Sequence, residues 1–413
     1  MNCRHCLAAL SLPFLDLGSA PPSNAYLSIA ALSSPETWFP LRLMVCHRCW
    51  LVQTEDHAGR EALFAEDYAY FSSFSTSWLT HSEAYVEAMR GRFGLGPHSR
   101  VCEIAANDGY LLQYVQQASI PCYGVEPTKS TAAAARAKGI TIVERFFGIA
   151  LADELTQQGL QVDLVAANNV LAHVPDINDF AAGVARLLKP SGVATFEFPH
   201  LLQMIQHSQF DTAYHEHYSY LSLSAVQRVF AASGLAVFDV QELSTHGGSL
   251  RVFAQRQDRG VHPLHPAVAA LLEREATAGL STAEGYVGFQ DQAERVKNDF
   301  MAFLIEARRS GKRVAAYGAA AKGNTLMNFA GVRPDLLAYV VDRNPAKAGK
   351  FMPGSRIPIV AEEQLRRDRP DGIVILPWNL KDEVMEQLSY VAAWGASFVT
   401  AVPELRTYRA GTF

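Results

Sequence analysis

Short strand-like segments alternate with helical stretches along the middle of this chain, and this alternation constrains the fold more than any other feature. The strand-like segments cover residues 101–104, 122–125, 162–167 and 193–198. Helical stretches lie between them, for example over residues 132–137 and 179–188. Strands that alternate with helices in this way form a parallel sheet covered by helices. We therefore expect an α/β domain over residues 67–258.

A second, smaller α/β unit is expected after residue 258. Apolar side chains recur at helical spacing over residues 293–304, which is typical of one buried helical face. Short apolar segments follow at residues 314–317, 339–341 and 373–376. A chain of 413 residues is also too long for one ordinary core. We predict three units, over residues 1–66, 67–258 and 259–413.

The composition argues against several classes of protein. Hydrophobic residues make up 49% of the chain and charged residues 19%, which is typical of a globular protein. A net charge of −5 gives no general attraction to nucleic acid or to anionic membranes. No stretch is apolar over the length of a membrane span, and the first residues lack the apolar core of a signal peptide. We expect a cytoplasmic enzyme without a membrane or nucleic-acid partner.

Two Cys-x-x-Cys pairs stand near the N-terminus, Cys3 with Cys6 and Cys46 with Cys49. In a reducing compartment such pairs are usually metal ligands rather than disulfides. Four thiolates complete the tetrahedral coordination of a metal ion and leave no position open for water or substrate, so the predicted site is a structural zinc site. Iron in a rubredoxin-like site and four unrelated cysteines are the alternatives.

Residues 101–110 combine a strand, a tight turn and the start of a helix. Small residues in such a turn let a nucleoside cofactor approach the backbone. A glycine-rich loop would carry glycine at positions 105, 107 and 109, whereas only Gly109 is present. An acid at the end of the next strand usually binds ribose hydroxyls. The predicted cofactor-binding residues are Glu103, Ala105, Asn107, Asp108, Gly109, Glu126, Asn168 and Asn169. An ordinary strand-to-helix turn is the alternative.

Residues 214–218 read Tyr-His-Glu-His-Tyr and place four groups capable of proton transfer or orientation close together. Imidazole is the natural base near neutral pH, and a neighbouring Tyr or Glu can orient it or stabilise an oxyanion. In an extended segment His215 and His217 would share one side, with Tyr214 and Glu216 on the other. A polar loop and a metal site remain alternatives, although the spacing is not that of His-Glu-x-x-His.

A second glycine loop follows residues 314–317. Gly318, Ala320 and Gly323 approximate a dinucleotide-binding turn, and Asp342 ends the next strand. The loop is not a P-loop, because Asn324 stands after Gly323 where Lys-Ser/Thr would be required. The ammonium of Lys322 could hold an anion such as a diphosphate. A structural turn with a solvated Lys322 is the alternative.

These motifs together resemble one family, the nucleotide-sugar C-methyltransferases that act at carbon 3 of 4-keto-deoxysugars in making branched sugars. The resemblance covers nearly the whole chain. It is carried by both cysteine pairs and by residues 22–27, 50–53, 103–112, 214–219, 247–251, 317–324 and 378–379. Family loops read Glu-Ile-Gly-Ser-Asn-Asp-Gly, so Ala105 and Ala106 depart from the family. The role of His200 is not explained by the resemblance.

The resemblance implies three domains and two bound groups. It implies an N-terminal zinc-binding domain, a central Rossmann-like class I methyltransferase domain that binds S-adenosylmethionine (SAM), and a C-terminal Rossmann-like α/β domain that helps to hold a dTDP-type nucleotide-sugar. It implies that His217 is the general base and that Tyr214, Glu216, His173 and Tyr68 surround the sugar. Arg251 and Lys322 are the implied substrate-binding residues.

The implied chemistry is abstraction of the carbon 3 proton by His217, formation of an enolate and in-line attack on the sulfonium methyl. A SAM-dependent methyltransferase for oxygen or nitrogen is the first alternative. A zinc-ribbon nucleic-acid module joined to a methyltransferase is less favoured, because the first 60 residues carry acids and no basic stripe. A nicotinamide dehydrogenase is the least favoured. We expect a monomer or a homodimer.

Overall fold

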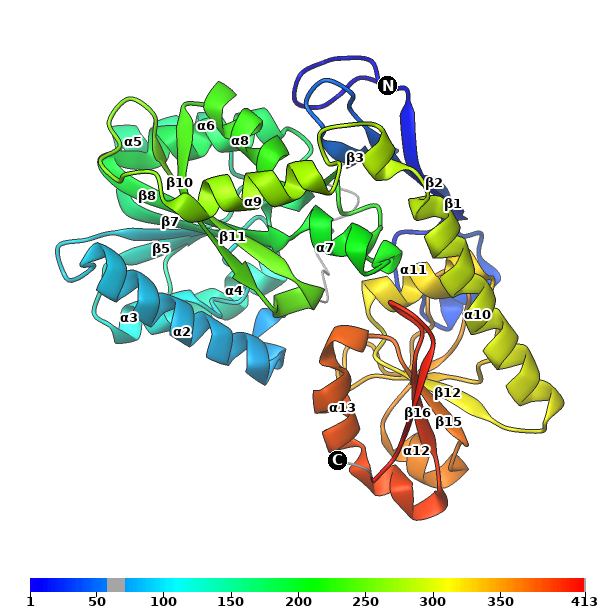
Figure 1. Cartoon of the computed structure of the whole chain (residues 1–413). Coiled ribbons are helices and arrows are strands. Elements are labelled where there is room, and N and C mark those ends of the chain that lie inside the picture. Colours follow the sequence, from blue (N-terminus) through cyan, green and yellow to red (C-terminus); the bar gives the residue numbers. More distant parts are fainter. Residues whose placement is uncertain (58–70, 412–413) are drawn as a thin grey trace.

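The chain folds around three β-sheets in a computed structural model that describes residues 1–57 and 71–411 (Figure 1). Tyr68 and the predicted boundary after residue 66 lie outside the described residues. Among the helices in the described ranges, none combines the length and the apolar character needed to cross a membrane. The predicted α/β class is confirmed, with a small cysteine-bearing sheet before it.

The N-terminal sheet contains four antiparallel strands in the order β1-β2-β3-β9. Three of them come from the first 54 residues: β1 (Leu12–Ala20), β2 (Phe39–Val45) and β3 (Val52–Thr54). The fourth, β9 (Ser219–Tyr220), follows the predicted catalytic cluster and belongs in sequence to the central region. This strand therefore connects the two units through backbone hydrogen bonds.

The central sheet has seven strands in the order β10-β11-β8-β7-β4-β5-β6. The first five strands along the chain are parallel: β4 (Val101–Ile104), β5 (Cys122–Val125), β6 (Ile142–Val143), β7 (Val162–Asn168) and β8 (Leu188–Pro199). The antiparallel strands β10 (Leu235–Leu243) and β11 (Ser249–Arg256) extend the sheet beyond β8. The predicted alternation is thus correct.

Helices cover both faces of the central sheet (Figure 1). One face packs against α2 (Thr76–Phe93), α3 (Leu112–Gln117) and α4 (Lys129–Ala137). The other packs against α5 (Ile149–Gln157), α6 (Ile177–Leu187), α8 (Leu223–Ala232) and α9 (Pro266–Thr277). Because both faces are covered, β4 is buried along its whole length and its carboxyl end is held rigidly where the cofactor loop begins.

The C-terminal sheet has six strands in the order β14-β13-β12-β15-β16-β17. Their bounds are β12 (Val314–Tyr317), β13 (Val340–Val341), β14 (Ile359–Val360), β15 (Gly372–Ile375), β16 (Ser397–Thr400) and β17 (Arg406–Arg409). All pairs are parallel except β16 with β17. The helices of this unit are α11 (Ala321–Ala330), α12 (Glu363–Asp368) and α13 (Lys381–Gln387).

A long helix, α10 (Phe289–Arg309), joins the N-terminal and C-terminal units. Its predicted apolar face is buried at Ala293, Val296, Phe300 and Leu304. At its start the ring of Phe289 stacks on Phe14 of β1 with 4.6 Å between ring centroids. One apolar cluster therefore runs from the N-terminal sheet across α10 into the C-terminal sheet.

Two short elements of the central unit border the predicted catalytic segment and lie toward the C-terminal unit. They are α7 (Leu201–Gln206) and the 3-10 helix η4 (Phe210–Thr212), and η4 packs against α11. A further 3-10 helix, η5 (Thr245–Gly247), contacts η7 (Trp378–Leu380) of the C-terminal unit. The catalytic segment thus lies where all three units meet.

Candidate active site

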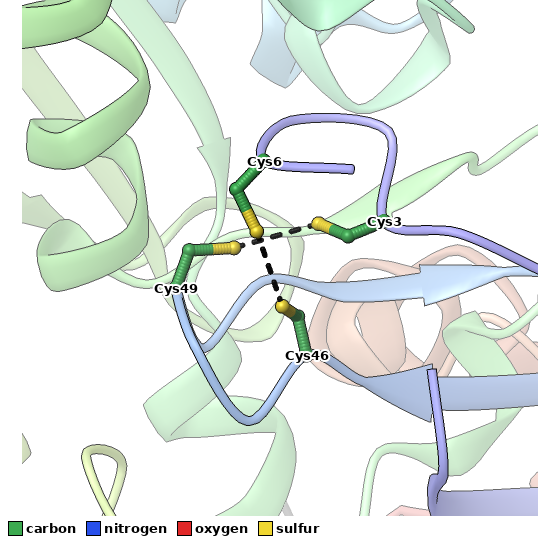
Figure 2. A group of neighbouring side chains, drawn as sticks. All are labelled: Cys3, Cys6, Cys46 and Cys49. Atoms are coloured by element: carbon green, nitrogen blue, oxygen red, sulfur yellow. Dashed lines mark hydrogen bonds between the residues drawn. The ribbon is translucent and has the colours of Figure 1, made fainter. Parts of the chain in front are cut away.

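The four cysteines converge on one point, as Figure 2 shows. Their sulfur atoms all lie within 4.8 Å of one another. In each pair the backbone folds back in the same way: Leu7 N–H donates to the Cys3 carbonyl at 2.9 Å, and Trp50 N–H donates to the Cys46 carbonyl at 2.8 Å. Leu7 and Trp50 also both have a positive φ.

This cysteine geometry suits a tetrahedral zinc ion. Zinc–sulfur bonds of about 2.3 Å place the sulfurs of such a site about 3.8 Å apart. The Cys3–Cys49 and Cys6–Cys46 sulfur distances are both 3.5 Å. Four thiolate donors leave no position for water or substrate, so the site serves the fold and not the chemistry.

The cofactor loop has the backbone conformation that glycines would favour, although two of the glycines are absent. Ala105, Asn107 and Gly109 have φ values of 60°, 48° and 77°. At Gly109 a Cβ atom would come within 2.3 Å of the Ile140 side chain. The loop therefore keeps the shape that brings a nucleoside to the backbone, with left-handed strain at Ala105.

The acid after β5 is positioned by the cofactor loop itself. One carboxylate oxygen of Glu126 accepts from Asn107 N–H at 2.9 Å, and the other accepts from Thr128 N–H at 2.9 Å. The side chains of Thr128 and Thr131 also hydrogen-bond to this carboxylate. Burial raises the pKa of Glu126. Glu103 is fully buried in β4, and burial raises its pKa well above the usual value.

The remaining predicted cofactor residues stand around the same carboxyl edge of the sheet. Asp108 accepts from Ser73 N–H at 3.3 Å. Asn168 ends β7 and is buried. Asn169 has a positive φ, and its side-chain nitrogen lies 3.1 Å from Nε2 of His246.

Residues 214–217 form a turn rather than the extended segment considered from the sequence. His217 N–H donates to the Tyr214 carbonyl at 2.9 Å. The turn places the ring centroids of Tyr214 and His217 3.9 Å apart, so the two side chains lie on the same side of the turn. His215 points away, toward the carbonyl oxygens of Phe39 and Pro40. Tyr214 and His217 are therefore paired, whereas His215 contacts the N-terminal unit.

The ring of His217 is oriented by a backbone carbonyl. Its Nδ1 lies 2.9 Å from the Thr212 carbonyl oxygen, which can only accept, so Nδ1 carries the proton and Nε2 the lone pair. His173 lies 4.5 Å away between ring centroids, and its own Nδ1 lies 2.8 Å from the Glu216 carbonyl oxygen. Burial lowers the pKa of His217 well below its ordinary value, and His173 and Lys322 lower it further. The ring is thus held neutral, as a base requires.

Glu216 faces the N-terminal unit. Its carboxylate accepts from the Asn24 side chain at 3.2 Å, and burial raises its pKa. Asn24 belongs to the segment between β1 and β2, so the N-terminal unit contributes directly to the predicted catalytic cluster.

Lys322 brings a positive charge from the C-terminal unit into the same region. Its ammonium donates to Asn379 at 2.8 Å and lies 4.5 Å from the Trp378 ring centroid. Trp378 in turn donates from its indole to Asp211 at 2.8 Å. Burial raises the pKa of Asp211 to about 6 and lowers the pKa of Lys322. Lys322 therefore faces the catalytic segment instead of open solvent.

The second glycine loop is shaped by packing. A Cβ at Gly318 would meet Pro377 at 2.4 Å, and one at Gly323 would meet Leu376 at 2.7 Å. Asp342 accepts from the backbone N–H groups of Ala319 and Asn344, both at 2.8 Å. Asp342 therefore braces the second glycine loop in the way that Glu126 braces the cofactor loop.

Arg251 has partners inside the central unit. Its guanidinium donates to Glu197 at 2.7 Å and to Gln241 at 3.1 Å, and it lies above the ring of Tyr85. His81 also lies 3.0 Å from the Glu197 carboxylate. Substrate binding by Arg251 stays a prediction.

Two histidines gain a structural place that the sequence did not indicate. His200 lies 2.7 Å from Glu275, whose carboxylate also accepts from the N–H groups of Leu223 and Ser224 at the start of α8. His246 stands in η5 with φ 55°, between Asn169 and the ring of Trp78. A strained non-glycine backbone is a frequent sign of a functional position, but φ is not readable from spacing.

A parallel sheet with a strained loop after its first strand, and an acid after the second, define a class I methyltransferase fold beside a four-cysteine domain. Comparisons with known proteins agree. Residues 3–64 match a zinc binding domain, residues 80–240 a methyltransferase domain and residues 244–403 the C-methyltransferase C-terminal domain. C-methyltransferase NovU from Streptomyces niveus is 34% identical over 410 residues, which cover 99% of this chain and 97% of that protein.

The chain therefore belongs to the family of SAM-dependent C-methyltransferases to which NovU belongs. Its cofactors are SAM and a structural zinc ion. This family sets aside the alternative of methylation at oxygen or nitrogen.

Solved structures that are similar to part of this chain include two methyltransferases. Magnesium protoporphyrin IX methyltransferase from Synechocystis with bound SAM is 16% identical, covers 49% of this chain and 100% of that chain, and has a TM-score of 0.36. An S-adenosylmethionine-dependent methyltransferase from Clostridium acetobutylicum is 10% identical, covers 43% and 92%, and has a TM-score of 0.34.

Proposed function

We propose that this enzyme transfers a methyl group from SAM to carbon 3 of a dTDP-type nucleotide-linked 4-keto-deoxysugar. The observation that carries the proposal is the neutral His217 ring, with Nδ1 held by the Thr212 carbonyl and Nε2 available as a base. A carbon acid requires a base of this kind because carbon has no lone pair with which to attack a methyl group. A 4-keto group supplies the acidity at carbon 3.

His217 accepts the carbon 3 proton at Nε2, and the electrons of the C–H bond move onto the keto oxygen as an enolate. Tyr214, whose ring stands 3.9 Å from that of His217, is placed to donate to this oxygen. Bound SAM would supply a methyl group that its sulfonium already activates, and it would leave as S-adenosylhomocysteine, which keeps the electrons of the broken sulfur–methyl bond. Carbon 3 thus loses a proton and gains the methyl group, and His217 returns its proton to solvent.

The C-terminal unit is suited to hold the nucleotide part of the substrate. Lys322 stands beside the catalytic turn and lowers the pKa of His217 through its charge. An ammonium at the N-terminal end of α11 favours a diphosphate, because both its charge and the helix amides attract anions. The sugar would then lie between Lys322 and His217.

Mass spectrometry of products from a panel of nucleotide 4-keto-deoxysugars tests this proposal. We expect a gain of one methylene unit that is retained on the carbon skeleton after the sugar is reduced. A matched panel with a 4-hydroxyl group in place of the ketone should give no product, because it lacks an acidic carbon 3. Equal turnover of the 4-hydroxy panel would contradict the proposal.

A further inference from the structure

The strand β3 connects the cysteine site directly to the catalytic segment. It starts three residues after Cys49 and pairs on one side with β2, which ends one residue before Cys46. On its other side it pairs with β9, with Val52 opposite Tyr220 and Gln53 opposite Ser219. The chain that leaves His217 thus enters the N-terminal sheet within two residues.

Thr54, the last residue of β3, holds the backbone of His217. Its hydroxyl donates to the His217 carbonyl at 2.9 Å, and its own N–H donates to the Tyr218 carbonyl at 3.2 Å. Thr54 is only 2% exposed, so water cannot readily replace these bonds. His217 is thus held in two places, at its backbone carbonyl by Thr54 and at Nδ1 of its ring by Thr212.

The cysteine site fixes Thr54 in turn. The fully buried Gln53 donates from its amide to Cys3 Sγ at 3.3 Å and accepts from Arg4 N–H at 2.9 Å. The Arg4 guanidinium donates to the Thr54 carbonyl at 2.9 Å and to the Pro175 carbonyl at 3.0 Å. Arg4 lies inside the first cysteine pair, so a bound zinc ion would fix the residue that orients Thr54.

We propose that Thr54 is a positioning residue for His217 and that the zinc site sets the place of Thr54 through Gln53 and Arg4. The proposal rests on the proposed function, in which His217 is the base. A small displacement of a base costs turnover and leaves binding largely intact, because the reacting atoms must meet in a narrow range of geometry. The zinc domain would then contribute to catalysis without touching the substrate.

The variant Thr54→Val keeps the branched shape and removes the hydroxyl donor. We expect kcat to fall on the order of 10-fold, with KM for the nucleotide-sugar and Kd for SAM little changed. Thr54→Ser restores the donor and should return most of the lost kcat. Thr156→Val is the matched control: its hydroxyl donates to the Arg186 carbonyl at 3.3 Å, far from the site, and its loss should leave kcat unchanged.

Removal of zinc from the full-length enzyme by a chelator provides a readout besides activity. Hydrogen exchange followed by mass spectrometry should show faster exchange in residues 212–220, while the strand at residues 162–168 stays protected. This measurement also carries the test if Thr54→Val does not fold. Unchanged protection of residues 212–220 after zinc removal would overturn the role of the zinc site.

Failure of this proposal differs from failure of the proposed function. If Thr54→Val has wild-type kcat while His217→Gln is inactive, Thr54 is not a positioning residue and the base assignment stands. If His217→Gln still exchanges the carbon 3 hydrogen with solvent at the wild-type rate, His217 is not the base, and the role of Thr54 in positioning a base falls with that assignment.

Discussion

Nδ1 of His217 lies 2.9 Å from the carbonyl oxygen of Thr212, and this one bond decides which nitrogen of the ring can act as a base. Thr212 ends η4, and its own N–H donates to the Gln209 carbonyl at 3.1 Å, so the accepting oxygen is itself held in place. A neutral imidazole with this tautomer presents Nε2 to a substrate.

Replacing His217 should therefore abolish turnover without unfolding the enzyme. We expect His217→Gln to lower kcat by about 10²-fold or more, the usual loss for a missing general base. SAM binding, measured by calorimetry, should survive because the cofactor loop lies on β4 and β5. His215→Gln is the matched control, since His215 faces the N-terminal unit, where it lies near the Phe39 and Pro40 carbonyl oxygens and edge-on to the Phe39 ring. Equal losses in both variants would point to a structural effect.

The acid side of the pH profile should lie lower than for an ordinary histidine. The pKa of His217 is well below 6.5, so the base stays unprotonated as pH falls through that value. We expect kcat/KM for the nucleotide-sugar to remain level around pH 6.5 and to fall only in more acidic buffer. A midpoint at or above 6.5 would show that the ring is not desolvated.

The same desolvation makes stability depend on pH. Burial lowers the pKa of His173 and of His246 to about 4 from 6.5. A depressed folded-state pKa contributes stability that is present above the unfolded value and is lost as pH falls. The free energy of unfolding in urea should therefore decline between pH 6.5 and about 4. His246→Asn, which tolerates the left-handed backbone, should flatten this decline, and an unchanged slope would contradict the assignment.

Ala105 stores strain that glycine would relieve. A left-handed alanine costs about 1–2 kcal/mol relative to glycine. About half of the stability gained by relieving this strain is lost again, because glycine gives the unfolded chain more conformational freedom. We expect Ala105→Gly to raise the free energy of unfolding by about 0.5–1 kcal/mol. Ala106→Gly is the control, because Ala106 is buried and its φ is not positive, so this change should destabilise the enzyme. Equal destabilisation by both changes would contradict the strain.

Much of the fold was predictable from local pattern. Buried parallel strands such as β12 are continuous apolar runs, and the spacing of the cysteine pairs alone predicts a shared metal ion. The strand β9 was not predictable, because two residues carry no periodicity and their partner Val52 is more than 160 positions away. The turn at Tyr214–His217 was not predictable either, since the sequence of residues 214–218 also suits an extended segment.

Several groups of the candidate site were predictable from the sequence, whereas the residues that support them were not. The family resemblance implied roles for His217 and His173, and the second glycine loop pointed to Lys322; the structure brings the three close enough for His173 and Lys322 to lower the pKa of His217. Thr54 and Asp211 carry no motif of their own. Thr54 is hydrogen-bonded to His217 and Asp211 to Trp378. Both partners lie far away along the chain, and such pairings depend on how separate units pack.

Exchange of the carbon 3 hydrogen with solvent deuterium tests the central claim most directly. The wild-type enzyme is incubated in heavy water with a nucleotide 4-keto-deoxysugar and S-adenosylhomocysteine, so that no methyl group can be transferred. We expect deuterium at carbon 3 with the wild type and none above background with His217→Gln. Methylation by the wild type with SAM, combined with equal exchange in both proteins, would contradict it.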